Sequence, residues 1–118
     1  MAAPNIVNVA AIYSKTAVLV VTTSATAIVT NSAASGKVLK VTTLYVSNIS
    51  TAAATVDVDL FRSSTAYRLT KTLNIPVGST VAVIEKGDTI NLEESDTLRL
   101  TASANSALEA LAAYEDIS

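Results

Sequence analysis

The stretch ATVDVDLF at 54–61 places two carboxylates, Asp57 and Asp59, two residues apart among apolar residues. Paired carboxylates can serve as a general acid and base, or as ligands of a cation. The same spacing puts both side chains on one face of a β-strand. A calcium ion needs about six to eight oxygen ligands, and no third ligand lies nearby in the sequence. The spacing therefore favours the solvated face of a strand, with Arg68 as a cross-strand ion-pair partner.

A second acidic group, Glu93, Glu94 and Asp96, lies in the stretch EESDT at 93–97. It lacks the regular Asp spacing and the distal Glu of a calcium-binding loop. We predict a turn with solvated acids, and a weak calcium site at these three residues stays open. A glycosidase pair would need aromatic sugar platforms, but the chain has no Trp and one Phe.

The residue types that most enzymes use for chemistry are missing. The chain has no His and no Cys, which removes the usual general base, thiol nucleophiles and the preferred ligands of zinc. Its three glycines lie far apart and form no phosphate-binding loop. We therefore predict no catalytic, cofactor-binding or metal-ligating residues, no small-molecule substrate, and no enzyme activity.

Charge and hydropathy limit the partners further. The formal net charge is −2, and the eight basic residues are scattered, so we expect no nucleic-acid partner. The longest strongly apolar run, AVLVV at 17–21, is too short for a membrane helix, so we expect no membrane contact. The first ten residues also lack the pattern of a secretory signal.

The chain of 118 residues is 50% hydrophobic, mostly through small aliphatic side chains, which suits a thin core between two sheets. β-branched residues and Thr dominate its segments, and Gly and Pro fall between them. We predict one all-β domain over 1–118, with 1–5 as an extended arm. About nine strands are expected: 6–13, 16–22, 25–30, 37–49, 54–62, 66–75, 80–85, 89–93 and 97–103.

Two of these segments carry further predictions. The stretch EKGDT at 85–89 predicts a hairpin, because Gly87 can adopt a positive φ. The segment 37–49 is apolar on both alternating faces. It is either a central strand covered on both sides or a strand whose outer face meets another subunit.

The tail after Asn105 is ambiguous. Ser106 and Glu109 form a capping box, and the Ala, Leu and Glu content favours a helix. Read as a strand, the same tail places Leu108, Ala110 and Ala112 on one face.

Most of the chain resembles small structural proteins of tailed bacteriophages, especially those that infect marine cyanobacteria. The most specific pieces are IPVGSTVAVI and LEESDTLRLTASANS, supported by GKVLKVTTLYVSNIS and TVDVDLFRSSTAYRL. The resemblance implies an antiparallel, jelly-roll-like β-sandwich of about eight to ten short strands, and it implies that 106–117 is the last strand. Where such proteins commonly carry Gly-Asp, this chain has Ser95–Asp96, which weakens the expectation of a positive-φ turn there.

The function that the resemblance implies is that of a virion component assembled in the host cytoplasm. Our first hypothesis is a capsid decoration or cement protein that binds the major capsid protein or other virion proteins, as a homo-oligomer, with a trimer favoured. A neck, tail or baseplate module is the alternative in the same class. A carbohydrate-binding or adhesin sandwich, with Tyr13, Tyr45 and Tyr114 as its aromatic supply, is the alternative in another class. Candidate residues for a subunit interface are Leu39, Tyr45 and Phe61, although Phe61 can equally cap one end of the sandwich.

Overall fold

The computed structural model describes residues 11–85 and 87–118, and in this part every regular element is a β-strand. The strands are β1 (Ile12–Val20), β2 (Thr26–Thr30), β3 (Val38–Asn48), β4 (Ala54–Arg62), β5 (Thr65–Ile75), β6 (Thr80–Ile84), β7 (Ile90–Leu92), β8 (Thr97–Ala102) and β9 (Leu108–Ile117). The predicted all-β class is confirmed. The proposed arm at 1–5 lies outside the described residues.

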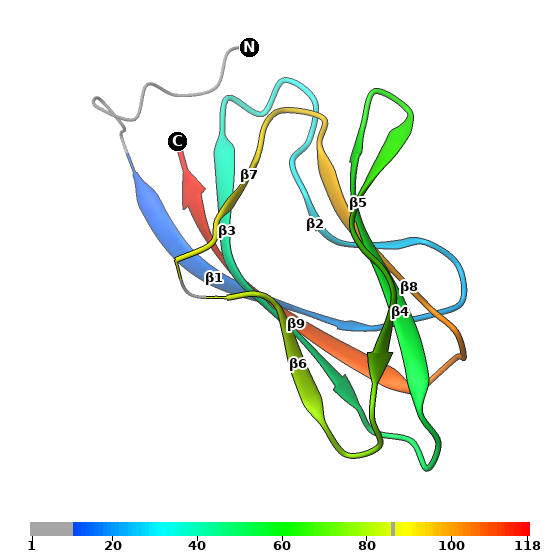
Figure 1. Cartoon of the computed structure of the whole chain (residues 1–118). Coiled ribbons are helices and arrows are strands. Elements are labelled where there is room, and N and C mark those ends of the chain that lie inside the picture. Colours follow the sequence, from blue (N-terminus) through cyan, green and yellow to red (C-terminus); the bar gives the residue numbers. More distant parts are fainter. Residues whose placement is uncertain (1–10, 86) are drawn as a thin grey trace.

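The strands form two antiparallel sheets that pack face to face (Figure 1). Sheet A has the order β1-β9-β3-β6, with β7 also pairing with β3, and sheet B has the order β2-β8-β4-β5. Strands from the two ends of the chain pair in a nested way: β1 with β9, β2 with β8, β3 with β6 and β4 with β5. This nested order is that of a jelly roll, so the predicted antiparallel sandwich is confirmed.

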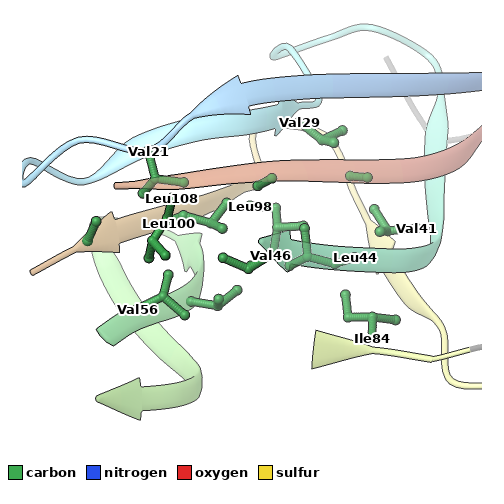
Figure 2. Close-up of a cluster of buried hydrophobic side chains, with 14 of the residues drawn as sticks. Val21, Val29, Val41, Leu44, Val46, Val56, Ile84, Leu98, Leu100 and Leu108 are labelled. Carbon is green, nitrogen blue, oxygen red and sulfur yellow. The ribbon is translucent and has the colours of Figure 1, made fainter. Parts of the chain in front are cut away.

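The core lies between the sheets and is built from Val, Leu, Ile and Ala side chains (Figure 2). On β8, Leu98 and Leu100 point inward and are fully buried, while Arg99 faces out, as the alternation of this segment predicts. Ala110 and Ala112 of β9 are buried in the same core. Small side chains at these positions let the two sheets approach closely.

Strand β3 carries a β-bulge that accounts for its apolar residues on both alternating faces. Its register with β9 shifts between Val41 and Thr43, so Thr42 is an extra residue in the pairing. Leu39 and Val41 point inward before the bulge, and Leu44 and Val46 point inward after it. One extra residue reverses the alternation, so the pattern does not require a strand covered on both sides.

The tail is strand β9, in the middle of sheet A between β1 and β3. Its whole length pairs with both neighbours, from Val20↔Glu109 to Ile12↔Ile117 on one side and from Asn48↔Leu108 to Val38↔Ile117 on the other. This pairing and the burial of Leu108 and Ala110 outweigh a local helix preference of less than about 1 kcal/mol per residue.

Two predictions from the sequence were wrong, one about a strand boundary and one about a hairpin. A break between 13 and 16 was predicted, but β1 runs through Ile12–Val20 in unbroken register with β9. The turn at 85–89 exists, and Gly87 has a φ of 99°, but it does not close a hairpin. Instead β6 and β7 both pair with β3, one after the other along its length. Both run antiparallel to β3, so the chain continues in the same direction after the turn, which interrupts the edge pairing with β3 without reversing the chain.

Serine occupies the left-handed region in several turns, including those before β5 and β8. Ser63 and Ser64 have φ values of 51° and 62°, and they connect β4 to β5 directly after the pair Arg62↔Thr65. Two successive positive φ values are those of a type I′ turn. Ser95 has a φ of 72°, so the turn before β8 adopts a positive φ at a residue other than glycine.

Candidate functional site

Asp57 and Asp59 lie on the outward side of β4, but their surroundings differ. Asp57 is partly exposed, accepts a hydrogen bond from Arg68 at 3.2 Å, and accepts another from the Thr72 N–H at 2.6 Å. The Arg68 partner is the one that the sequence predicts. Thr72 has a positive φ within β5, where the register with β4 shifts. The hydrogen bond from its N–H to Asp57 therefore holds this irregular part of β5 in place.

Asp59 is buried, which corrects the prediction of a solvated side chain. Its side chain is 1% exposed and accepts a hydrogen bond from Arg99 Nε at 2.9 Å. The Arg99 guanidinium lies 3.9 Å from the centre of the Phe61 ring. A buried carboxylate needs such a cation, and the cation is in turn stabilised by the aromatic face. The two aspartates are therefore committed to separate structural contacts and do not form an acid–base pair.

The acidic turn is also more structured than its sequence predicts. Asp96 is 2% exposed, and its carboxylate accepts hydrogen bonds from Arg62 through both of its oxygens and from the Glu93 N–H at 2.8 Å. Glu93 remains solvated and contacts Arg62 at 2.9 Å, while Glu94 accepts the Gly36 N–H at 3.0 Å. The prediction of solvated acids holds for Glu93 and is wrong for Asp96.

Opposing effects set the pKa of Asp96. Burial raises the pKa, but hydrogen bonds from Arg62 and the Glu93 N–H outweigh burial and hold it below the usual 3.8. Asp96 is therefore ionised at neutral pH and is not poised to exchange protons there. Glu93 and Asp96 both contact Arg62, while Glu94 accepts from Gly36, so the three acids are engaged in holding the chain. Across residues 11–85 and 87–118, no group of three or more potential metal-ligating side chains comes together.

A third buried carboxylate, Asp116 near the end of β9, was not singled out from the sequence. Lys15 Nζ lies 2.9 Å and Lys37 Nζ 3.1 Å from Asp116 Oδ2. Burial raises the pKa of Asp116, but hydrogen bonds from both lysines more than offset this and leave it below the usual 3.8. No local signal could predict this contact, because its members lie at opposite ends of the chain.

Two asparagines that close opposite loops were missed as well. Asn31, after β2, donates hydrogen bonds from its side-chain amide to the carbonyls of Lys37 and Leu92, both at 2.9 Å. Asn48, at the end of β3, donates to the carbonyls of Ala52 at 2.8 Å and Ile75 at 2.9 Å. Both side chains are buried, so they satisfy loop carbonyls that would otherwise lose their hydrogen bonds to water.

The outward face of sheet A differs from that of sheet B. Val18, Leu111 and Tyr45 are direct neighbours across β1, β9 and β3, since Val18 pairs with Leu111 and Leu111 with Tyr45. All three are exposed, Val18 by 74% and Tyr45 by 46%. We call these three residues the apolar row. Sheet B instead presents the ion pairs of Asp57 and Asp59 on its outward side.

A hollow of about 460 Å³ lies beside one end of the apolar row. It is lined by Val18, Leu19, Val20, Glu109, Ala110 and Leu111, so its walls come from β1 and β9. Most of these residues are apolar, and Glu109 is the one acid among them. The hollow and the apolar row together make this part of sheet A the best candidate for an interaction surface.

The three candidate interface residues occupy different places. Tyr45 lies in the apolar row and is available for contact. Leu39 is a correction: it points into the core and is buried, so it does not face a neighbouring subunit. Phe61 lies on the outward side of sheet B, where Arg99 covers one face of its ring. The structure therefore does not bring the three candidates together.

The tyrosines expected to supply an aromatic binding face do not gather on one surface. Tyr45 points outward from sheet A, and Tyr114 is partly buried against the core. Tyr13 pairs with Asp116, on the side of sheet A opposite to Tyr45. A sugar-binding platform needs aromatic rings on a common face, and these three do not provide one.

No protein-family model matches this chain, and a comparison with curated proteins finds no match either. Among the residues that the structure describes, no helix has the length and apolar character that crossing a membrane requires.

Proposed function

We propose that this chain is a non-enzymatic structural protein of a tailed-bacteriophage particle, and that it decorates the exterior of the head by binding repeated sites on the capsid. The observation that carries the proposal is the exposed apolar row Val18–Leu111–Tyr45 on the outward face of sheet A. An apolar surface that crosses three strands costs free energy in water, and a protein partner would relieve that cost.

Charge supports the outer side of the particle. The formal net charge of −2 gives no attraction to packaged nucleic acid, so a position facing the genome is disfavoured. Each ion pair formed by the buried aspartates Asp59 and Asp96 joins two separate segments of the sandwich. A rigid module of this kind suits a lattice, where each copy must present the same surface. The jelly roll by itself carries no function, because the fold hosts both capsid proteins and lectins.

The experiment is antibody labelling of purified virions viewed by electron microscopy, combined with quantitative mass spectrometry of the copy number. We expect many copies spread over the head. A few copies at one vertex or along the tail would favour the neck, tail or baseplate alternative instead. Absence of the protein from purified particles would overturn the virion role altogether.

A glycan array provides the test for the carbohydrate-binding alternative. The separation of Tyr13, Tyr45 and Tyr114 onto different sides of the sheet argues against it. We expect no glycan to bind above background. A reproducible hit that Tyr45→Ala abolishes would replace the decoration role with an adhesin role.

A further inference from the structure

The free edge of β1 is the least protected strand edge of the sandwich. Within the described residues β1 pairs with β9 alone, and no other strand of this part of the chain pairs with its second edge. The strand has nine residues, a span of about 30 Å, and its register with β9 shows no bulge. An exposed, regular and mostly apolar edge is a template for another strand.

The other edge strands carry the features that usually prevent such pairing. β2 and β6 have five residues each, and β2 contains a register shift between Ala27 and Val29. β5 is longer, but it carries Arg68, Lys71 and the positive-φ residue Thr72. β1 has one charged residue, Lys15, whose ammonium group is held by Asp116 at 2.9 Å. No charge on β1 is therefore free to repel an approaching strand.

The backbone of β1 presents its hydrogen-bonding groups in a defined pattern. Ala11 and Ser118 exchange two hydrogen bonds, and the Val21 N–H donates to the Leu108 carbonyl. Because the register is antiparallel and unshifted, every second residue of β1 exchanges hydrogen bonds with β9. These are the odd-numbered residues. The N–H and C=O groups of the even-numbered residues, from Ile12 to Val20, therefore point away from β9 to the free edge.

We propose that this edge pairs with the β1 edge of a second copy of the chain, antiparallel and centred on Thr16. This register uses every outward-pointing residue, since Ile12 faces the second copy's Val20, Ser14 faces its Val18, and Thr16 faces its own counterpart. The same two-fold pairing places Lys15 opposite Ala17, so the like charges of the two copies do not face each other.

The side chains fit the same arrangement. Ile12, Tyr13, Val18 and Val20 are all exposed in the single chain. Pairing joins Ile12 to Val20 on the outward face and places Tyr13 of one copy opposite Leu19 of the other. Val20 lines the hollow described above, so Ile12 of the second copy, opposite Val20 on the outward face, lies beside that hollow. The occupant is a second copy because the exposed apolar residues Ile12 and Val20, at the two ends of β1, meet each other in this register, and Tyr13 meets Leu19.

The dimer is independent of the proposed virion role, because it needs no other protein. Sedimentation velocity of the purified full chain over a concentration series tests it. We expect a monomer–dimer equilibrium. Val18→Lys should weaken the dimer by about tenfold or more, since it removes apolar surface beside the paired edge and places a lysine from each copy near the two-fold axis, where the two charges repel. Val77→Lys changes another exposed valine, between β5 and β6 and away from β1, so it is the control and should leave the dimer unchanged.

Two further variants test the geometry. Thr16→Pro removes an N–H that points to the free edge and spares the bonds to β9, so it should give a folded monomer. In the double variant Ser14→Asp/Val18→Lys, each new carboxylate would face the new ammonium group of the other copy, and the dimer should be tighter than with either single change. A wild type that stays monomeric or forms trimers overturns the proposal. So does a dimer unaffected by Val18→Lys and Thr16→Pro, or a double variant that shows no recovery.

Discussion

Every buried carboxylate described in this sandwich is held by a cation from a separate part of the chain. Asp59 on β4 contacts Arg99 on β8, and Asp96 before β8 contacts Arg62 at the end of β4. Such pairs add little net stability compared with an apolar pair, but losing one member leaves a buried charge uncompensated. Their contribution is therefore to specify which strands lie side by side.

The lowered pKa values of Asp96 and Asp116 predict a loss of stability in acid. Both are held below 3.8, so the folded state favours the ionised carboxylates. This stabilisation is complete above about pH 5, where both carboxylates are also ionised in the unfolded chain, and it is lost as pH falls through the native pKa values. Urea denaturation at a series of pH values should show the free energy of unfolding falling steadily below about pH 4.

The variant Asp96→Asn serves as the control for the acid effect. It should cost about 2–3 kcal/mol at pH 7, because the buried amide cannot accept from Arg62 through both of its side-chain atoms and Arg62 keeps only the solvated Glu93 as a charged partner. Its stability should then fall less steeply in acid than that of the wild type. Equal slopes for the two proteins would show that Asp96 is not a source of the pH dependence.

The turn between β4 and β5 offers a stabilising change at single residues. Ser63 and Ser64 both occupy the left-handed region, which costs a non-glycine residue of this kind free energy. Ser63→Asn combined with Ser64→Gly supplies the residues that a type I′ turn prefers, and should raise the free energy of unfolding by about 1 kcal/mol. Thermal denaturation measures the gain. Ser32→Gly, where φ is not positive, should bring no gain and would reveal a nonspecific effect of glycine if it did.

At the scale of the strands, the local sequence pattern predicted where the strands lie better than it predicted which strands pair. The segments from 25–30 to 97–103 all became strands, because β-branched residues and alternation report directly on a half-buried extended chain. The bulge at Thr42 was hidden, since one extra residue has no signature of its own in the sequence. The EKGDT turn was recognised while its role was misassigned, because turn chemistry does not say which strand each flank will pair with.

Deleting Thr42 tests the role of the bulge. Without the extra residue, the inward-facing Leu39 and Val41 cannot keep their register while Leu44 and Val46 also point inward. The deletion should cost at least about 3 kcal/mol or prevent folding, as measured by urea denaturation. Thr42→Ala keeps the residue count and loses only the hydrogen bond to the Ala113 carbonyl at 3.2 Å, so it should cost about 1 kcal/mol. Similar costs for both changes would mean that the bulge is not needed to set the register.

At the scale of the whole molecule, the outward faces of the two sheets show which contact residues the sequence could predict and which it could not. Tyr45 was recognised as a candidate contact because it belongs to a segment with too many apolar residues for one buried face. Val18 and Leu111 were not, since each is an ordinary apolar residue until β9 inserts between β1 and β3 and aligns them with Tyr45. The burial of Asp59 and Asp96 and the whole Asp116 contact were missed for the same reason, because the cations that hold these carboxylates are distant in the chain.

Tyr45→Asp tests whether the outward face of sheet A binds the particle. Tyr45 is half exposed in the apolar row, so the variant should fold normally, while a buried carboxylate at the contact should weaken binding by at least about tenfold. Cosedimentation with purified heads stripped of the protein measures the binding. Tyr67→Asp is the matched control, because Tyr67 is 57% exposed on β5 of the other sheet. If both variants bind like the wild type, the contact lies elsewhere on the molecule. If Tyr67→Asp alone fails to bind, sheet B faces the particle and the apolar row is left for contacts between copies of the chain.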